Sequence, residues 1–303
     1  MKLGLNSAIL PDCSFKEVID ICSGQGLPYV EICCWPVGGS DRRYAGVTHI
    51  DIDRLNEDSI EDIKKYLQIK DVSISALAYY PNLLDSDQDK AKAAAEHLKN
   101  LIRCAPLLNV HHVNTFIGRD KNKTVRENLG MVKSIWPEIL EAAETYQVDI
   151  GIENCPMYFT EDEWPGGCNL ASSPWLWDEI FAILPSPRLG LNYDPSHLLL
   201  QGMDYIQPIY DYRDRIFHAH IKDLHIHKDR IDRYGRFAYP SQYSSPKLPG
   251  LGDIDWGAYM SALYDIQFDG AVCIELEDKN FETSEADVRK AIEISVRFMR
   301  QFI

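Results

Sequence analysis

Apolar runs rich in β-branched residues alternate with longer segments of helical periodicity along most of the chain. The run Leu3–Ala8 is apolar, and the segment Ser14–Gly24 after it has apolar residues at i, i+3, i+4 and i+7 counted from Phe15. The first pattern is typical of a buried strand and the second of one face of an α-helix. The alternation recurs and predicts strands at Leu3–Ala8, Tyr29–Trp35, Val72–Tyr80, Val110–Ile117, Val148–Glu153, Leu189–Asp194, Ile216–Lys222 and Ala271–Glu277.

Helices are predicted between these strands. Ser14 is suited to cap the first helix and Gly24 to end it. Pro137 is expected to break or kink the helix over Lys123–Tyr146, because proline removes a backbone donor inside a helix. The predicted helices are Ser14–Gly24, Asp58–Gln68, Asp89–Cys104, Lys123–Tyr146, Pro174–Leu184, a short one around Asp204–Tyr212, Trp256–Tyr264 and Glu285–Phe302.

Eight strand–helix units in a chain of 303 residues predict a (β/α)₈ TIM barrel. Such barrels need about 250 residues, and their strands are buried on both faces. A doubly wound open sheet is the alternative that the same pattern permits. No shift in composition marks a boundary, so residues 1–303 are expected to form one domain.

The amino-acid composition of the chain argues against some classes of binding partner. The chain has 31 Lys and Arg against 46 Asp and Glu, a formal net charge of −15. Such a charge repels phosphate backbones, so no nucleic-acid partner is expected. No apolar run reaches the roughly 18 residues of a membrane span. The eight cysteines include no CxxC pair. Together with the lack of a basic-then-apolar leader, these features predict a cytoplasmic protein without a membrane partner.

Carboxylates and imidazoles follow four consecutive predicted strands. Because the carboxyl ends of barrel strands share one rim, we expect these side chains to converge there. Carboxylate oxygens with one imidazole nitrogen suit Mn²⁺, Mg²⁺ or Co²⁺ better than Zn²⁺, which they do not exclude. The strand period places His218 and His220 on one face, and Glu275 and Glu277 likewise, so the choice within each pair stays open. The four strand ends carry Glu153, Asp194, His218 or His220, and Glu275 or Glu277.

The remaining histidines and cysteines are weaker candidates. His49 and His97 read as solvated, and the pair His111 and His112 starts the fourth strand at the end of the barrel away from the chemistry. His225 and His227 follow the seventh strand and are close enough to reach the mouth. The cysteines that end strands, Cys33, Cys34 and Cys155, are expected to be buried as small apolar side chains.

Aromatic side chains at strand ends suggest a sugar ligand, since flat rings can stack on a sugar face. Packing between barrel and loops explains each ring equally well. Arg119 follows the fourth strand and could grip a carboxylate or phosphate, or make only a surface salt bridge. The rings concerned are Trp35, Tyr79, Tyr80, Phe116 and Trp164.

The strand-end motifs resemble those of the sugar phosphate isomerase/epimerase family, the xylose-isomerase-like TIM barrels, over essentially the whole chain. This family includes ketose 3-epimerases, hydroxypyruvate isomerase and inosose dehydratase. Two departures are noted. A Lys222-Asp223 pair stands where ketose epimerases often have an arginine, and the second and third strands lack the additional histidine ligands of the endonucleases of the superfamily. The resemblance is carried by Ile152-Glu153-Asn154, Asp194-Pro195-Ser196-His197, His218-Ala219-His220-Ile221-Lys222-Asp223, Pro249-Gly250-Leu251-Gly252-Asp253-Ile254-Asp255-Trp256 and Ile274-Glu275.

The resemblance implies one divalent metal ion, Mn²⁺ before Mg²⁺, Co²⁺ or Zn²⁺, bound by Glu153, Asp194, His220 and Glu275. It further implies that Glu153 and Glu275 are the catalytic acid and base, and that His197 touches a substrate oxygen. Proton abstraction and return through a metal-stabilised enediolate would isomerise or epimerise a ketose or keto-sugar.

The same base could instead start a β-elimination, which would make the chain a lyase on a keto-sugar or keto-glycoside. His197, Lys222 or His225 would then protonate the leaving group. A carbohydrate-binding barrel without activity is the third hypothesis. The predicted substrate-binding residues are His197, Lys222, Trp35 and Arg119, and a homo-oligomer or a partner subunit stays open.

Overall fold

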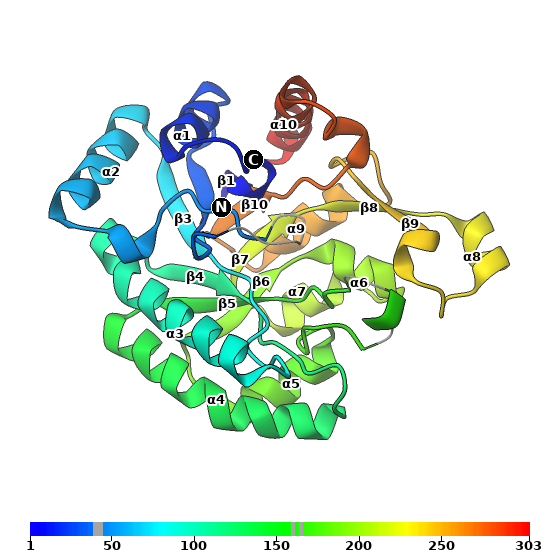
Figure 1. The fold of residues 1–303 in the computed structure, drawn as a ribbon. Coiled ribbons are helices and arrows are strands. Elements are labelled where there is room, and N and C mark those ends of the chain that lie inside the picture. The colour runs from blue at the N-terminus through cyan, green and yellow to red at the C-terminus, as the bar shows by residue number, and fades with distance from the viewer. Residues whose placement is uncertain (39–44, 159–160, 164–165) are drawn as a thin grey trace.

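Eight parallel strands close into a barrel in the computed structural model, which describes residues 1–38, 45–158, 161–163 and 166–303 (Figure 1). The order around the barrel is β1-β10-β7-β6-β5-β4-β3-β2, and β1 pairs with β10. The TIM barrel prediction is confirmed, and this pairing rules out the open sheet. The barrel strands are β1 (Lys2–Asn6), β2 (Tyr29–Cys33), β3 (Ser73–Ala78), β4 (His112–Thr115), β5 (Asp149–Glu153), β6 (Leu189–Tyr193), β7 (Ile216–Ile221) and β10 (Ala271–Ile274).

Helices surround the barrel and cover the outer faces of its strands (Figure 1). An antiparallel hairpin of β8 (Asp223–Ile226) and β9 (Ser244–Lys247) leaves the barrel after β7. The α-helices of the described residues are α1 (Phe15–Gly24), α2 (Glu57–Lys70), α3 (Gln88–Cys104), α4 (Val125–Tyr146), α5 (Pro174–Ile183), α6 (Pro195–Gln201), α7 (Gln207–Asp211), α8 (Lys228–Tyr234), α9 (Trp256–Asp265) and α10 (Glu285–Met299). None of these described helices is long and apolar enough to cross a membrane.

Local capping fixes several helix starts. Ser14 caps α1 as predicted, and its partner Glu17 bonds back to the Ser14 backbone, which completes a capping box. Pro137 does not break the helix, because α4 runs through it. The carbonyl that Pro137 leaves without a donor is that of Lys133, one turn earlier. Both residues are exposed, so water can satisfy this carbonyl.

The connection after β6 contains one helix more than predicted. The short helix expected around Asp204–Tyr212 is α7, whereas α6, directly after β6, was not predicted. Asp194 caps α6 by accepting a hydrogen bond from the Ser196 backbone at 2.7 Å. A run of only seven residues gives too little periodicity to be recognised.

His49 and His97 were expected to be exposed to solvent, but both are buried, so that expectation was wrong. His97 lies on the core-facing stripe of α3 with Ala94 and Leu101, and its Nε2 lies 2.8 Å from the carbonyl of Cys34. Both ring nitrogens of His49 lie 3.1 Å from backbone carbonyl oxygens. A buried polar group needs such partners, and here backbone carbonyls provide them.

The barrel interior is polar, whereas the layer between strands and helices is apolar. On β5 the side chains of Ile150 and Ile152 belong to the apolar core. Because strand side chains alternate, Glu153 points to the other face, into the barrel. TIM barrel interiors are usually filled by Val, Ile and Leu. The fully or almost fully buried polar residues of this interior are Glu31, Asn114, Asn192, His218 and His220.

Asp223 fixes the segment that follows the hairpin. Its carboxylate accepts five hydrogen bonds, from the backbone N–H groups of Leu224, Gly250, Gly252 and Ile254 and from the indole of Trp256, at 2.8 to 3.2 Å. Asp223 itself is fully buried. One side chain thereby holds the start of the hairpin and the start of α9 at the rim of the barrel.

Replacing Asp223 by Ala is expected to lower the free energy of unfolding by about 3–5 kcal/mol, because five donors lose a buried acceptor. Urea unfolding followed by far-UV circular dichroism measures this loss. Asp223→Asn is the matched control, since it keeps one carbonyl oxygen and should lose less. Equal stability of Asp223→Ala and the wild type would contradict this account of the loop.

Candidate active site

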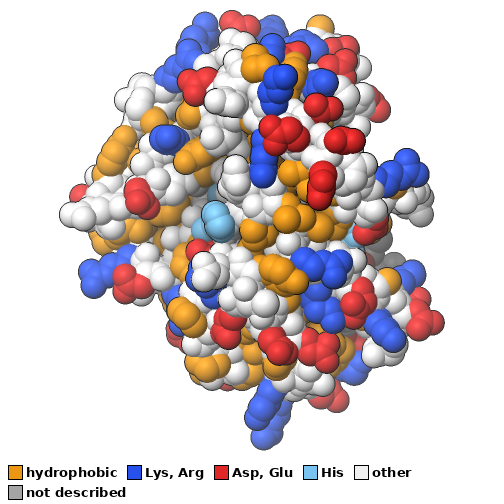
Figure 2. Space-filling view, turned by 90° about the vertical axis from the view of Figure 1, so that its left-hand side faces the viewer, with side chains coloured by type: hydrophobic (Ala, Val, Ile, Leu, Met, Phe, Trp, Pro, Cys, Tyr) orange, Lys and Arg blue, Asp and Glu red, His pale blue; other side chains and the backbone are white. Residues whose placement is uncertain are grey.

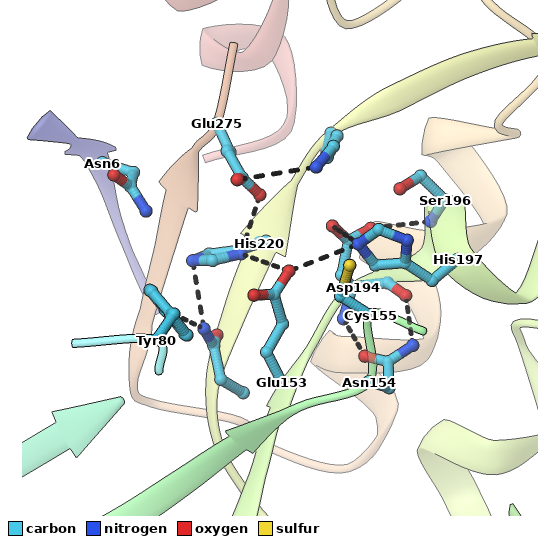
Figure 3. A network of polar contacts seen from close by, with 12 residues as sticks. Asn6, Tyr80, Glu153, Asn154, Cys155, Asp194, Ser196, His197, His220 and Glu275 are labelled. Carbon is cyan, nitrogen blue, oxygen red and sulfur yellow. Dashed lines mark hydrogen bonds and ion pairs between the residues drawn. The ribbon is translucent and has the colours of Figure 1, made fainter. Parts of the chain in front are cut away.

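Four strand ends bring the predicted ligand residues together at one end of the barrel (Figure 3). Glu153 ends β5, and Asp194 directly follows β6. His220 lies near the end of β7, and Glu275 directly follows β10. One ligand atom of each residue lies within 4.8 Å of those of the other three. The side chains that were expected to converge therefore do so.

The electrostatics of this set favour a bound cation. Three buried atoms, Asp194 Oδ2, His220 Nδ1 and Glu275 Oε2, make no hydrogen bond. His220 Nδ1 lies 3.0 Å from Glu275 Oε2 and 3.6 Å from Glu153 Oε1. Three carboxylates and an imidazole nitrogen thus face the same small space. Buried polar atoms rarely stay unsatisfied, and a divalent cation would satisfy all of these.

The close packing of these carboxylates and the imidazole also shifts their pKa values. Burial raises the pKa of Asp194, which has no exposed surface. Burial also opposes ionisation of Glu153, but the hydrogen bond from His197 and the nearby imidazole of His220 outweigh it and lower the pKa of Glu153. Against its own burial, the nearby Glu31 and Glu275 raise the pKa of His220 well above its usual value. A proton on this imidazole compensates the carboxylates, and a bound cation would displace that proton.

Glu31, in β2, is a residue of this site that the sequence analysis missed. Its Oε2 lies 2.7 Å from His220 Nε2, and its Oε1 accepts a hydrogen bond from the Tyr80 hydroxyl at 2.5 Å. The carboxylate is fully buried. With a cation bound, a proton shared between Glu31 and Nε2 would leave the Nδ1 lone pair of His220 directed at the space beside Glu153 and Glu275. The sequence could have indicated Glu31 as a site residue, because it is a single carboxylate within the apolar run Tyr29–Cys33.

The choice between the two histidines of β7 is resolved by depth. His218 lies below His220 in the barrel and contacts Ser75 Oγ at 3.1 Å and Asn192 Oδ1 at 2.9 Å. Burial lowers the pKa of His218 to about 3, so this imidazole is neutral at pH 7. His220 therefore faces the carboxylate set, and His218 supports the barrel interior.

His197 and Lys222 place two buried nitrogen groups beside the carboxylates. His197 Nε2 lies 3.3 Å from both Glu153 Oε1 and Asp194 Oδ2. Lys222 Nζ lies 3.5 Å from Glu275 Oε1 and 3.1 Å from Glu277 Oε1. Although burial opposes the charge, these carboxylates raise the pKa of Lys222 well above its usual value. Lys222 is therefore a charged donor that is only 6% exposed.

A cavity of about 340 Å³ opens above this set. Glu153, Glu275, His197 and Lys222 line its floor, and Trp35 lines its wall. Its volume lies within the range of sites that enclose small organic ligands, roughly 300–1,000 Å³. The carboxylate set is therefore accessible to a small molecule.

The sequence profile of the family described as "Xylose isomerase-like TIM barrel" matches residues 19–302. The chain belongs to this family. Inosose isomerase of Bacillus velezensis is 22% identical over 316 aligned residues, which cover 99% of this chain and 100% of that protein. Inosose dehydratase of Lactiplantibacillus plantarum is 24% identical over 128 residues, which cover 42% of each chain.

Solved structures show the same barrel. The crystal structure of the IOLI protein with a bound zinc atom has a TM-score of 0.72 at 21% identity and covers 100% of this chain and 99% of that chain. The D-psicose 3-epimerase of Clostridium cellulolyticum H10, solved with D-tagatose, has a TM-score of 0.70 at 16% identity and covers 100% and 99%. At these identities the likeness shows the fold.

The aromatic rings that were predicted to stack on a sugar lie in different places relative to the cavity. Trp35, Tyr80 and Phe116 line the cavity. Tyr79 instead packs edge-on against Trp35 and His97, with ring centroids 4.9 and 4.6 Å away. Trp164 lies outside the described residues.

Arg119 is half-buried and is not among the described residues that line the cavity. Its backbone N–H and carbonyl both bond to the side chain of Asn82, which holds the strand-four loop in place. The structure thus gives Arg119 a position beside the mouth but no contact with the cavity. Its assignment to substrate binding stays a prediction.

The weaker candidates lie mostly away from the carboxylate set. His225, in β8, contacts Asp253, and His227, directly after β8, contacts Ser245 in β9. Neither histidine is among the described lining residues. His112 begins β4 at the opposite end of the barrel, as predicted. Cys33 is buried, and burial raises the pKa of its thiol to about 12.

Figure 2 shows the molecule from the side on which Lys and Arg side chains alternate with Asp and Glu and with apolar groups. Neither sign of charge gathers into a continuous area on this face. Such interspersed charges are typical of a solvated surface.

Proposed function

We propose that this xylose-isomerase-like barrel is a divalent-metal-dependent isomerase or epimerase that acts on a ketose or keto-sugar by moving a proton beside the carbonyl group. The observation that carries the proposal is the pair Glu153 and Glu275, which approach the same imidazole nitrogen from strands three positions apart in the barrel. Two carboxylates at one substrate carbon can remove a proton and return it. The names of an inosose isomerase and a D-psicose 3-epimerase support this class.

Glu153, Asp194, His220 and Glu275 would hold the metal ion. Three carboxylates with one imidazole suit Mn²⁺, our first expectation, and also Mg²⁺, Co²⁺ or Zn²⁺, the metal named for one structure of the same fold. When bound, such an ion polarises a carbonyl group and stabilises negative charge on its oxygen.

The protein side chains would carry out the proton transfers and position the substrate. One of the two glutamates removes the proton, and the other delivers a proton to the same or the neighbouring carbon. Lys222 keeps Glu275 ionised, because its ammonium lies 3.5 Å from the carboxylate. His197, on the other side of Glu153, is placed to donate a hydrogen bond to a substrate oxygen.

Proton NMR in D₂O tests this function. The protein is loaded with Mn²⁺ for the reaction, stripped of the ion before spectra are recorded, and offered ketoses, inososes and keto-glycosides. Deuterium in the carbon beside the carbonyl, together with a new stereoisomer or aldose, is the expected result. A protein with bound metal that exchanges no proton in any of these compounds would contradict the proposal.

A lyase is the second candidate, and the buried cation Lys222 favours it. A protonated donor beside the base could protonate a leaving hydroxyl or aglycone after proton removal. The inosose dehydratase relative is consistent with such chemistry. In the same NMR experiment a lyase would release water or an aglycone, whereas an epimerase would give only the inverted stereoisomer.

Glu31→Gln is expected to weaken metal binding about 10–100-fold, because the amide no longer fixes the tautomer and orientation of His220. Isothermal titration with Mn²⁺ measures the affinity directly. Tyr80→Phe is the matched control, since it removes a hydrogen bond from Glu31 but leaves the contact between Glu31 and His220. Unchanged affinity in Glu31→Gln would contradict this role.

A further inference from the structure

The cavity has a polar floor and largely apolar walls among the described residues. The charged or ionisable groups nearest the strand ends form the floor, namely Glu153, His197, Lys222, Glu275 and Glu277. Above them, side chains of three segments form the walls, from β1 to β4, from the loop after β5 through α6, and from the hairpin. The apolar and aromatic lining residues are Ala8, Trp35, Ala45, Tyr80, Phe116, Pro156, Met157, Tyr158, Leu200, Leu224, Tyr239, Pro240 and Pro246.

These walls suit only part of a sugar. A free sugar carries an oxygen on every carbon, and each buried hydroxyl needs a hydrogen-bond partner. The floor supplies such partners through Lys222, His197 and the carboxylates. Among the wall side chains, Ser241 and Ser244 can supply a partner, whereas Pro156, Leu200 and Pro246 supply none. The floor therefore matches the reacting sugar, whereas the space between the walls matches an apolar group.

The hairpin wall is held in place by hydrogen bonds. Asp253 accepts from the backbone N–H of Ile226 at 2.7 Å, and the five-bond cluster around Asp223 fixes the base of the hairpin. The Tyr239 hydroxyl donates to the carbonyl of Tyr158 at 3.4 Å, which joins the hairpin to the loop after β5 above the floor. A wall built this way exists before a ligand arrives, so little ordering is needed on binding.

We infer that the substrate is a keto-sugar bearing an apolar or aromatic substituent, which lies between Leu200 and the hairpin wall while the sugar lies on the floor. The inference rests on the proposed function and specifies the substrate class of the same site. It applies to isomerase and lyase chemistry alike, because both need the carbonyl at the floor.

The test uses the Mn²⁺-loaded protein and a hexose whose keto group lies at a ring carbon other than the anomeric one. This sugar is compared with its phenyl glycoside, which keeps the keto group, and with the corresponding keto-disaccharide. Turnover is followed by deuterium incorporation and by product formation. We expect kcat/KM for the phenyl glycoside to exceed that of the free keto-hexose by about 10–100-fold, from burial of the ring. Equal or better turnover of the free sugar, or preference for the disaccharide, would overturn the inference and leave the proposed function intact. Inertness of all three compounds would overturn the inference, and inertness of the ketoses and inososes as well would overturn the proposed function.

Substitutions of residues in the cavity walls test where the apolar substituent lies. Leu200→Asn is expected to reduce the preference for the phenyl glycoside at least fivefold, with Pro246→Ser as a second variant should the first fail to fold. Leu251→Asn is the control, because Leu251 is exposed and is not among the described lining residues. Its preference should equal that of the wild type. A preference that both wall variants retain would overturn the placement of the substituent.

Discussion

Glu275→Gln protein is expected to turn over its substrate about 10²–10⁴-fold more slowly than the wild type while keeping its fold. Glutamine has the size of glutamate but cannot accept the proton, and acid–base catalysis contributes about this factor. Glu275 also belongs to the four-residue metal set, so weaker metal binding adds to the loss. The measurement is kcat at saturating Mn²⁺ with the substrate identified by NMR, together with circular dichroism of the variant.

Glu277→Gln is the matched comparison for this prediction. Glu277 follows the same strand and also contacts Lys222, at 3.1 Å, but it does not belong to the metal set. Its substitution should therefore cost much less activity than that of Glu275. A fully active Glu275→Gln protein, or equal losses in the two variants, would remove Glu275 from the catalytic pair.

Removal of divalent ions by a chelator is expected to abolish activity and to lower the melting temperature. Without a cation, Glu153, Asp194 and Glu275 stay crowded and buried, and their repulsion destabilises the folded state. Restoring Mn²⁺ at about a hundred times its dissociation constant should return roughly 2.7 kcal/mol of stability. Thermal unfolding of stripped and reloaded protein measures the shift, and the activity assay follows the same samples.

Asp194→Asn separates metal binding from structural damage. An asparagine can still cap α6, because its side-chain oxygen can accept the bond from Ser196 that Asp194 now accepts. The variant should fold, yet its melting temperature should respond little to Mn²⁺. An undiminished metal response in Asp194→Asn, or full activity in chelated wild type, would contradict the assigned set.

The sequence was sufficient for the barrel and for the four converging side chains because both depend on simple rules. Alternating periodicities define strands and helices, and parallel strands of a barrel present their carboxyl ends at one rim. Glu153, Asp194 and Glu275 stand at or just after strand ends, where those rules apply directly. Strand periodicity alone could not choose between His218 and His220, because it gives the face of a side chain but not its depth.

Other features depend on contacts between distant segments, which one sequence does not display. Glu31 lies within a strand rather than at its end, and its partner is 189 residues away. His97 stands on an apolar helical stripe, but its acceptor is the backbone of another segment. The hairpin after β7 owes its position to the carboxylate of Asp223. Each of these is a polar group whose burial became predictable only once its partner was known.

The pairing of β1 with β10 also has a consequence for how the protein is made. Barrel closure joins the first and last strands, and contacts of such large sequence separation form late and slowly. During synthesis, a chain that has emerged only through β7 contains Glu31, Glu153, Asp194 and His220 but lacks the strand that delivers Glu275. Metal binding should therefore begin only when the carboxyl-terminal segment docks, so that loading of the ion reports completion of folding.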